Sequence, residues 1–199
     1  MATITAETVK TLREQSGAGV MECKRALEET GGDIEKAAAI LKERGQAAAA
    51  KRAGREANEG QIGQYIHTGG KIGVLIEVNC ETDFVARTDE FQRLVRDLAI
   101  QVAGLRPLYP TIESIPAAEL DAKKAELMAG DTVQAKPEAV RAQIVEGQLK
   151  KWFSEVVLLE QPFRDQDRTV GELIVDAIHK TGENIKVRRF VRFELGEEM

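Results

Sequence analysis

Four side chains could act as metal ligands or as nucleophiles: Cys23, Cys80, His67 and His179. No two of them have the short spacing of metal-binding motifs, so we expect neither a metal nor a cofactor. A thiol nucleophile at Cys80 with His67 as its base is an alternative, because the two fall on adjacent predicted strands. The neighbouring carboxylate of Glu81 disfavours it, since a nearby negative charge raises a thiol pKa.

Phosphate-binding loops are missing from the sequence, which contains neither a P-loop nor a dinucleotide-binding fingerprint. The glycine-bearing segment 16–19 precedes a predicted helix, whose N-terminus could hold an anion. A tight turn between two short helices is the simpler interpretation, and we prefer it. The sequence thus offers no strong candidate for a catalytic group, and the thiol of Cys80 stays open as an alternative.

The composition indicates a soluble chain that can bury a mostly aliphatic core. Of its 199 residues, 43% are hydrophobic and only 5% are aromatic. The 28 basic and 33 acidic residues give a net charge of −5, which disfavours a nucleic-acid binder. The sequence has no run of eighteen apolar residues and no signal-peptide pattern. We therefore expect a cytoplasmic protein that contacts neither nucleic acid nor membrane.

Residues 1–55 are predicted to form a small three-helix domain. Thr5 and Asp33 are suitable N-caps for the first and third helices, and the segment 16–19 separates the first two. The Ala- and Arg-rich segment 46–55 is interpreted as a helical tail that becomes an exposed linker, in preference to a nucleic-acid patch. Apolar residues recur at helical spacing in all three helices: Val9, Leu12, Val20, Cys23, Ala26, Leu27, Ile34, Ala37, Ala38 and Leu41.

Residues 56–199 are predicted to form an α+β domain, in which about three antiparallel strands are covered by helices. Strict alternation over 71–79 predicts a strand with one buried face, and Gly69-Gly70 predicts a hairpin turn before it. In the last predicted strand, Arg189 shares the parity of apolar residues, a conflict that the pattern does not explain. We expect further helices over 88–102, 117–128, 138–159 and 169–182, and strands over 60–67 and 185–195.

One connection in this second domain has an unusual composition. The segment 79–87 leaves the buried strand and precedes a helix, yet it contains neither glycine nor proline. It places the large apolar side chain of Phe84 beside the anion Asp83. The ring either packs back onto the sheet or projects as an interface anchor, where a buried aromatic contributes about 2 kcal/mol or more. The pattern alone leaves both interpretations open.

This connection also resembles a signature of a known family. Residues 77–87 are similar to the second signature of the bacterial elongation factor Ts family, and residues 12–27 are similar to the first. Ser16 stands where threonine is usual in that first signature. Shorter similarities at 161–163, 169–171 and 184–189 extend the resemblance over the whole chain.

The resemblance implies a guanine-nucleotide exchange factor for elongation factor Tu in protein biosynthesis, which needs no chemistry of its own and is not an enzyme. Such a factor binds the GDP-bound GTPase, displaces magnesium and promotes GDP release so that GTP can bind. The N-terminal domain would be ubiquitin-associated-like and would dock on the nucleotide-binding domain of the GTPase. The residues implied are Arg13, Val20 and Met21 for that docking, Thr82, Asp83, Phe84 and Val85 for magnesium displacement, and Tyr65 and His67 for the outer domain of the GTPase.

The chain resembles the short form of the family, which forms a homodimer through its sheet. It is expected to have one strand-hairpin-helix unit, without the duplicated core and the inserted coiled-coil hairpin of longer members. Two other classes of function are alternatives: a stand-alone helical adaptor, which does not explain the segment 82–85, and a cysteine hydrolase that uses Cys80.

Overall fold

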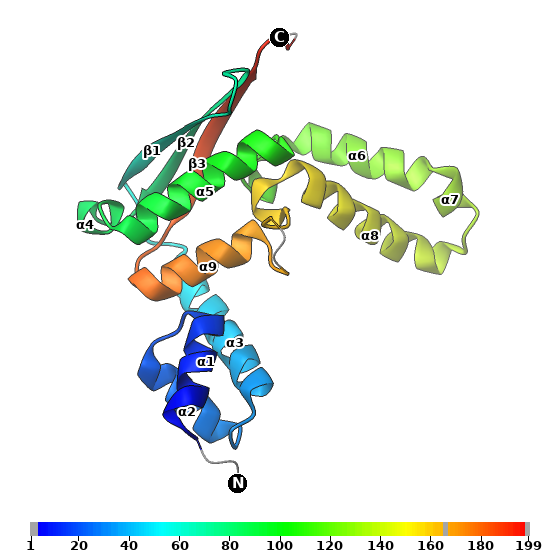
Figure 1. Cartoon of the computed structure of the whole chain (residues 1–199). Helices are drawn as coiled ribbons and strands as arrows, with labels where there is room; N and C mark the ends of the chain where they lie inside the picture. Colours follow the sequence, from blue (N-terminus) through cyan, green and yellow to red (C-terminus); the bar gives the residue numbers. More distant parts are fainter. Residues whose placement is uncertain (1–3, 165–166, 198–199) are drawn as a thin grey trace. The chain divides into compact units, whose positions relative to one another are not determined.

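The structure is a computed structural model that describes residues 4–164 and 167–197. In these ranges the chain forms helices and one three-stranded sheet, which confirms the α+β class (Figure 1). It divides into two compact units. The first comprises residues 1–61, 78–94 and 172–186, and the second comprises residues 62–77, 95–171 and 187–199. The domain boundary at residue 55 stays a prediction.

The first unit contains the expected three-helix bundle: α1 (Ala6–Ser16), α2 (Val20–Glu29) and α3 (Ile34–Arg52). The Thr5 hydroxyl accepts a hydrogen bond from the backbone N–H of Thr8, and the Asp33 carboxylate caps α3. Gly17 ends α1 at φ 66°, a backbone conformation that favours glycine. The three helices enclose their own core of Leu12, Ala18, Cys23, Ala26, Leu27, Ala37 and Leu41.

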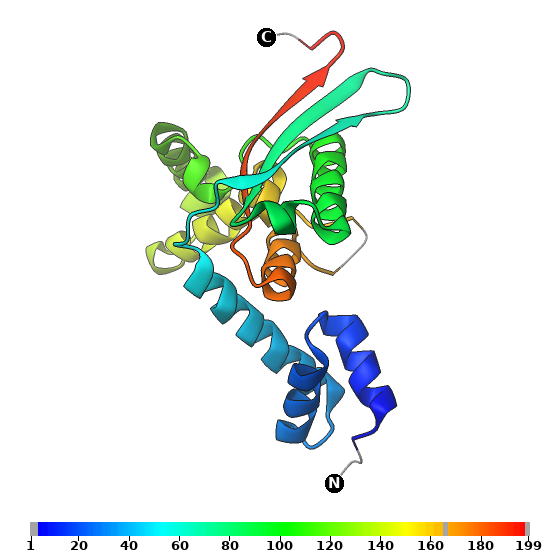
Figure 2. The same ribbon diagram turned by 90° about the vertical axis from the view of Figure 1, so that its left-hand side faces the viewer.

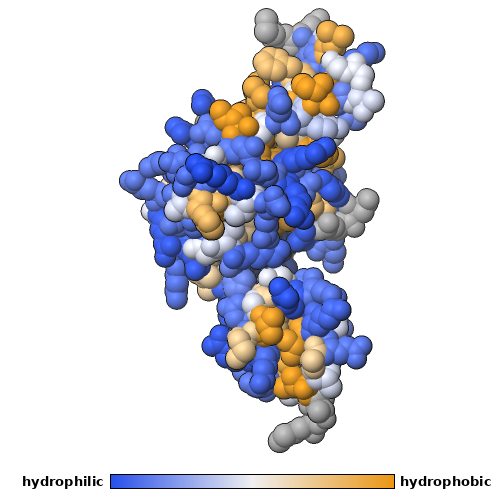
Figure 3. Space-filling view, turned by 60° about the vertical axis from the view of Figure 1, so that its left-hand side comes forward, coloured by the Kyte–Doolittle hydropathy of each residue, from blue (hydrophilic) through white to orange (hydrophobic). Residues whose placement is uncertain are grey.

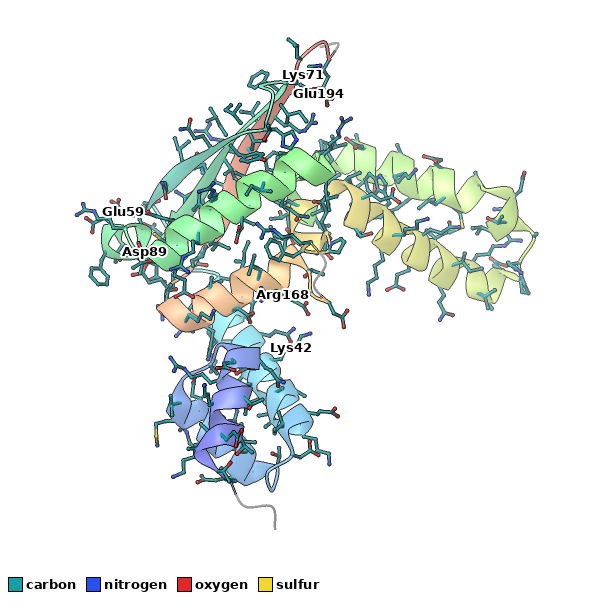
Figure 4. The ribbon with its side chains drawn as sticks, in the orientation of Figure 1. Lys42, Glu59, Lys71, Asp89, Arg168 and Glu194 are labelled. Carbon is teal, nitrogen blue, oxygen red and sulfur yellow. The ribbon has the colours of Figure 1, made fainter. Side chains whose placement is uncertain are left out.

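The same unit contains α4 (Asp83–Ala86), the start of α5 and most of α9 (Val170–Thr181). Two contacts join α3 to α9 and to the residue that follows it. Lys42, labelled on α3 in Figure 4, forms an ion pair with Glu172 at 2.6 Å. The Arg52 guanidinium donates a hydrogen bond to the carbonyl of Gly182 at 2.9 Å. Since α3 ends at Arg52, most of the predicted linker over 46–55 is helical.

The sheet has the strand order β1-β2-β3, with β1 (Glu59–Ile66), β2 (Ile72–Cys80) and β3 (Lys186–Glu194). Its antiparallel register follows from hydrogen bonds near the hairpin, where His67 N–H donates to Ile72 and Leu195 N–H donates to Lys71. The predicted alternation in β2 is confirmed, because its even-numbered residues Val74, Ile76 and Val78 are buried, while Leu75 between them is exposed.

Helix α5 (Asp89–Leu105) packs on the buried face of the sheet (Figure 2). Thr88 caps it as expected, since its hydroxyl accepts a hydrogen bond from the N–H of Phe91. A Cβ atom at Gly63 would lie 2.3 Å from the Val95 side chain, so only glycine permits this close approach of helix and strand.

The opposite face of the sheet carries a row of exposed apolar side chains, which we call the open face: Ile62, Ile66, Leu75, Val191, Phe193 and Leu195. Arg189 lies among them, and its guanidinium is 2.7 Å from the carboxylate of Glu77. This explains why Arg189 shares the parity of apolar residues. In this half of β3 those apolar side chains lie on the outward face of the sheet, where a charged residue is tolerated.

Helices α6 (Ala117–Ala129), α7 (Asp131–Gln134) and α8 (Glu138–Val156) form a helical hairpin in the second unit (Figure 1). The expectation that the chain has no such hairpin is wrong. The three prolines between 107 and 116 do break the chain, but only into short 3-10 and extended segments before α6. No helix among the described residues is long and apolar enough to cross a membrane.

Candidate functional site: an exposed aromatic turn and a bundle surface

The segment 81–87 is a helical turn held by the end of β2. Thr82 is extended and acts as the N-cap of α4, since its hydroxyl accepts a hydrogen bond from the N–H of Val85 at 3.4 Å. Threonine at this position stops the strand and starts the turn. The sequence did not predict this helix, because four residues are too few for a periodic pattern.

The turn separates its side chains into an inner and an outer set. Val85 and Ala86 are 6% and 9% exposed and anchor the turn against the protein, while the ring of Phe84 is 78% exposed. The sequence left open whether the ring packs onto the sheet or projects, and the structure shows that it projects. Covering an exposed aromatic ring with a partner protein removes apolar surface from water and lowers the free energy.

Asp83, beside the ring, is also exposed. Its carboxylate forms an ion pair at 2.7 Å with the guanidinium of Arg87, one helical turn further along. Both side chains are more than half exposed, so water screens this pair and it contributes little to stability. The carboxylate of Asp83 thus remains accessible to an incoming partner.

Glu183, which the sequence analysis missed, holds the turn from the loop after α9. One oxygen of its carboxylate accepts hydrogen bonds from the N–H groups of Glu81 and Thr82, at 3.1 and 3.0 Å. The other oxygen accepts a bond from the Thr82 hydroxyl at 2.6 Å. Glu183 is remote in sequence from the turn, and no local pattern predicts such a pairing.

A second surface lies where α1 meets α2. Arg13 is exposed on α1, and the apolar side chains of Val20 and Met21 are 50% and 64% exposed at the start of α2. Figure 3 shows hydrophobic side chains at the surface of the bundle in the lower part of that view. Val20 and Met21 thus form a small apolar patch on the surface of the bundle, next to the exposed Arg13.

The glycine-bearing segment 16–19 forms a turn, as preferred from the sequence. The carboxylate of Glu22 accepts a hydrogen bond from the N–H of Gly19 at 3.2 Å, so a side chain already occupies the start of α2. His179 of α9 lies 3.0 Å from the same carboxylate. A carboxylate already placed at the start of α2 disfavours a second anion there by charge repulsion.

Tyr65 and His67 are neighbours at the hairpin end of β1. The Tyr65 hydroxyl is 3.0 Å from Nδ1 of His67, and their rings lie 6.0 Å apart. Tyr65 is half-buried and His67 is exposed. In Figure 4, Lys71 and Glu194 mark this end of the strands.

No support for thiol chemistry comes from the surroundings of Cys80. Burial, followed by the charge of Glu183, raises the pKa of this thiol to about 11, so it is protonated at neutral pH. His67 pairs with the first residue of β2, whereas Cys80 is its last. Among the residues that the structure describes, no group of three or more His, Cys, Asp or Glu could hold a metal ion.

Comparison with known proteins places these features in one family. Residues 2–197 match the family model for elongation factor TS. The chain is 54% identical over 195 residues to elongation factor Ts of Heliobacterium modesticaldum, covering 98% of this chain and 91% of that protein. It is 55% identical to the protein of that name from Carboxydothermus hydrogenoformans, covering 98% and 90%, and 53% identical to that of Thermoanaerobacter sp., covering 98% and 96%.

Proposed function

The chain belongs to the elongation factor Ts family, and on that premise we propose that it releases GDP from elongation factor Tu by displacing the magnesium ion. The family consists of translation elongation factors that act in nucleotide exchange. The observation that supports magnesium displacement is the turn of α4, where Phe84 projects into solvent while its neighbours Val85 and Ala86 are buried.

A small shift of the residues that hold the magnesium ion is enough to displace it. GDP is held largely through its phosphates and the ion that neutralises them. Magnesium needs near-ideal octahedral geometry, so a slight shift of the GTPase elements around it weakens its binding. Phe84 acts as an apolar wedge between helices of the GTPase, and the accessible carboxylate of Asp83 fixes its orientation. Thr82 and Val85 shape the turn, one as its cap and the other as its anchor.

The bundle supplies affinity for the same partner. Arg13, Val20 and Met21 dock on the nucleotide-binding domain of elongation factor Tu, where the exposed apolar side chains are covered. Tyr65 and His67 contact its outer domain. Because binding free energies are reciprocal, a factor that weakens GDP binding is itself displaced by GDP, and the exchange cycle can turn over. No bond is made or broken by this chain, and it acts in the cytoplasm with its partner.

A second copy of this chain is proposed to cover the open face of the sheet. The face is apolar, and a three-stranded sheet with one bare side has too little buried area. It contains a shallow hollow of about 290 Å³, lined by Ile62, Leu75 and Val191 beside the Glu77–Arg189 ion pair. Such a mixed surface can match its own copy across a twofold axis.

The proposed exchange activity is tested by the release of fluorescently labelled GDP from elongation factor Tu, followed by stopped flow. The wild-type chain is expected to accelerate release, and Cys80→Ser is expected to retain the full effect. A helical adaptor would bind the GTPase without changing the rate of GDP release. If the wild type does not accelerate release, or if Cys80→Ser abolishes the effect while Phe84→Ala is harmless, the proposal is wrong.

A further inference from the structure

The turn that carries Phe84 is joined to two distant segments through the carboxylates of Glu81 and Glu183. We call the group of residues that make these contacts the clasp: Arg55, Glu81, Thr82, Glu183 and Asn184. The three hydrogen bonds from the turn to Glu183 use both of its carboxylate oxygens. A carboxylate that accepts hydrogen bonds from two backbone N–H groups and a hydroxyl forms the stronger, charge-assisted class of interaction.

The clasp is reciprocal. While Glu183 binds the backbone next to Glu81, the carboxylate of Glu81 accepts a hydrogen bond of 2.7 Å from the backbone N–H of Asn184. The side-chain amide of Asn184 is buried and donates to the carbonyl of Arg55 at 2.7 Å. The loop after α9 and the segment after α3 therefore both fix the start of the α4 turn.

The contact with Thr82 determines how the turn is capped. Its hydroxyl donates its proton to Glu183, which leaves an oxygen lone pair for the N–H of Val85. A helix of four residues has no stability of its own, because forming the first turn is unfavourable. The direction in which Phe84 points thus depends on bonds from outside the turn.

We propose that Glu183 is a positioning residue for nucleotide release, which acts by holding the Phe84 ring in its projecting orientation. This inference rests on the proposed exchange function and assigns it a residue outside the 82–85 motif. A wedge works only if its direction is fixed before contact, since a ring that must first be ordered loses part of its binding free energy. Glu183 makes no contact with the GTPase in this account.

The test is a double-mutant cycle on the rate of GDP release from elongation factor Tu. Glu183→Ala removes all three bonds and is expected to slow release roughly tenfold. Glu183→Gln can still accept the two backbone bonds and donate to the Thr82 hydroxyl, so it is expected to recover most of that loss. In the Phe84→Ala background, Glu183→Ala should have no further effect, because no wedge remains to be positioned.

The control is Glu126→Ala, which removes a glutamate that is also held by hydrogen bonds, in this case to Lys123 of the α6–α8 hairpin. It should leave the release rate unchanged. An equal loss from Glu183→Ala with and without Phe84 would show a general structural effect and overturn the inference alone, as would no loss at all. If Phe84→Ala itself does not slow release, the magnesium-displacement proposal fails and the inference falls with it. Glu183→Gln keeps the cycle usable if the alanine variant unfolds.

Discussion

Phe84→Ala is expected to slow the release of GDP from elongation factor Tu by roughly thirtyfold relative to the wild-type chain. The ring is 78% exposed in the free protein, so its removal costs little folding free energy. Its burial in the GTPase is worth about 2 kcal/mol, which corresponds to that factor in rate if the contact forms during release. Stopped-flow release of labelled GDP at saturating factor measures the effect.

A suitable control is Leu108→Ala, because Leu108 is also a large exposed apolar residue, 63% exposed, outside the proposed contact surfaces. This variant should release GDP at the wild-type rate. Circular dichroism of both variants should match that of the wild type. Equal rates for Phe84→Ala and the wild type would contradict the wedge mechanism.

Leu75→Asp is expected to dissociate the proposed homodimer. Leu75 lies on the central strand of the open face and is half-exposed in the single chain, so the monomer tolerates a polar residue there. In the dimer, the two new carboxylates would be buried in a largely apolar interface, where each charge loses its hydration. That cost is about 4 kcal/mol in total, or a roughly thousandfold weaker association. Sedimentation velocity over a concentration series measures it.

The matched control for this second prediction is Leu108→Asp, the same substitution at an exposed leucine that is not part of the open face. It should sediment as the wild type does, at twice the mass of one chain. If the wild-type chain stays monomeric at all concentrations, the homodimer proposal is wrong. A Leu75→Asp variant that still dimerises would move the interface elsewhere.

Local sequence signals predicted most elements of the fold, because each of those signals acts within a few residues. Thr5, Asp33 and Thr88 are caps whose hydrogen bonds reach only three residues ahead. The alternation in β2 reports directly which side chains face the core. Such short-range patterns are visible without knowledge of the rest of the chain.

The features that the sequence did not predict depend on contacts between remote residues. The direction of the Phe84 ring follows from the burial of Val85 and Ala86 and from bonds to Glu183, about a hundred positions away. Arg189 shares the parity of apolar residues because this half of β3 carries its apolar residues on the open face, which the strand's own pattern does not predict. The helical hairpin was expected to be absent because the chain resembles the short form of the family. The patterns over 117–128 and 138–159 predict its two helices singly, and nothing in either pattern predicts that they pack together.

The most direct test of the account compares GDP release by the wild type and by Phe84→Ala, with magnesium present and after its removal by a chelator. If the ring acts by displacing the ion, the wild type should be much faster than the variant in magnesium. Once the ion has been removed, the two rates should agree within about twofold, because nothing is left to displace. The same ratio of rates with and without magnesium would contradict the account.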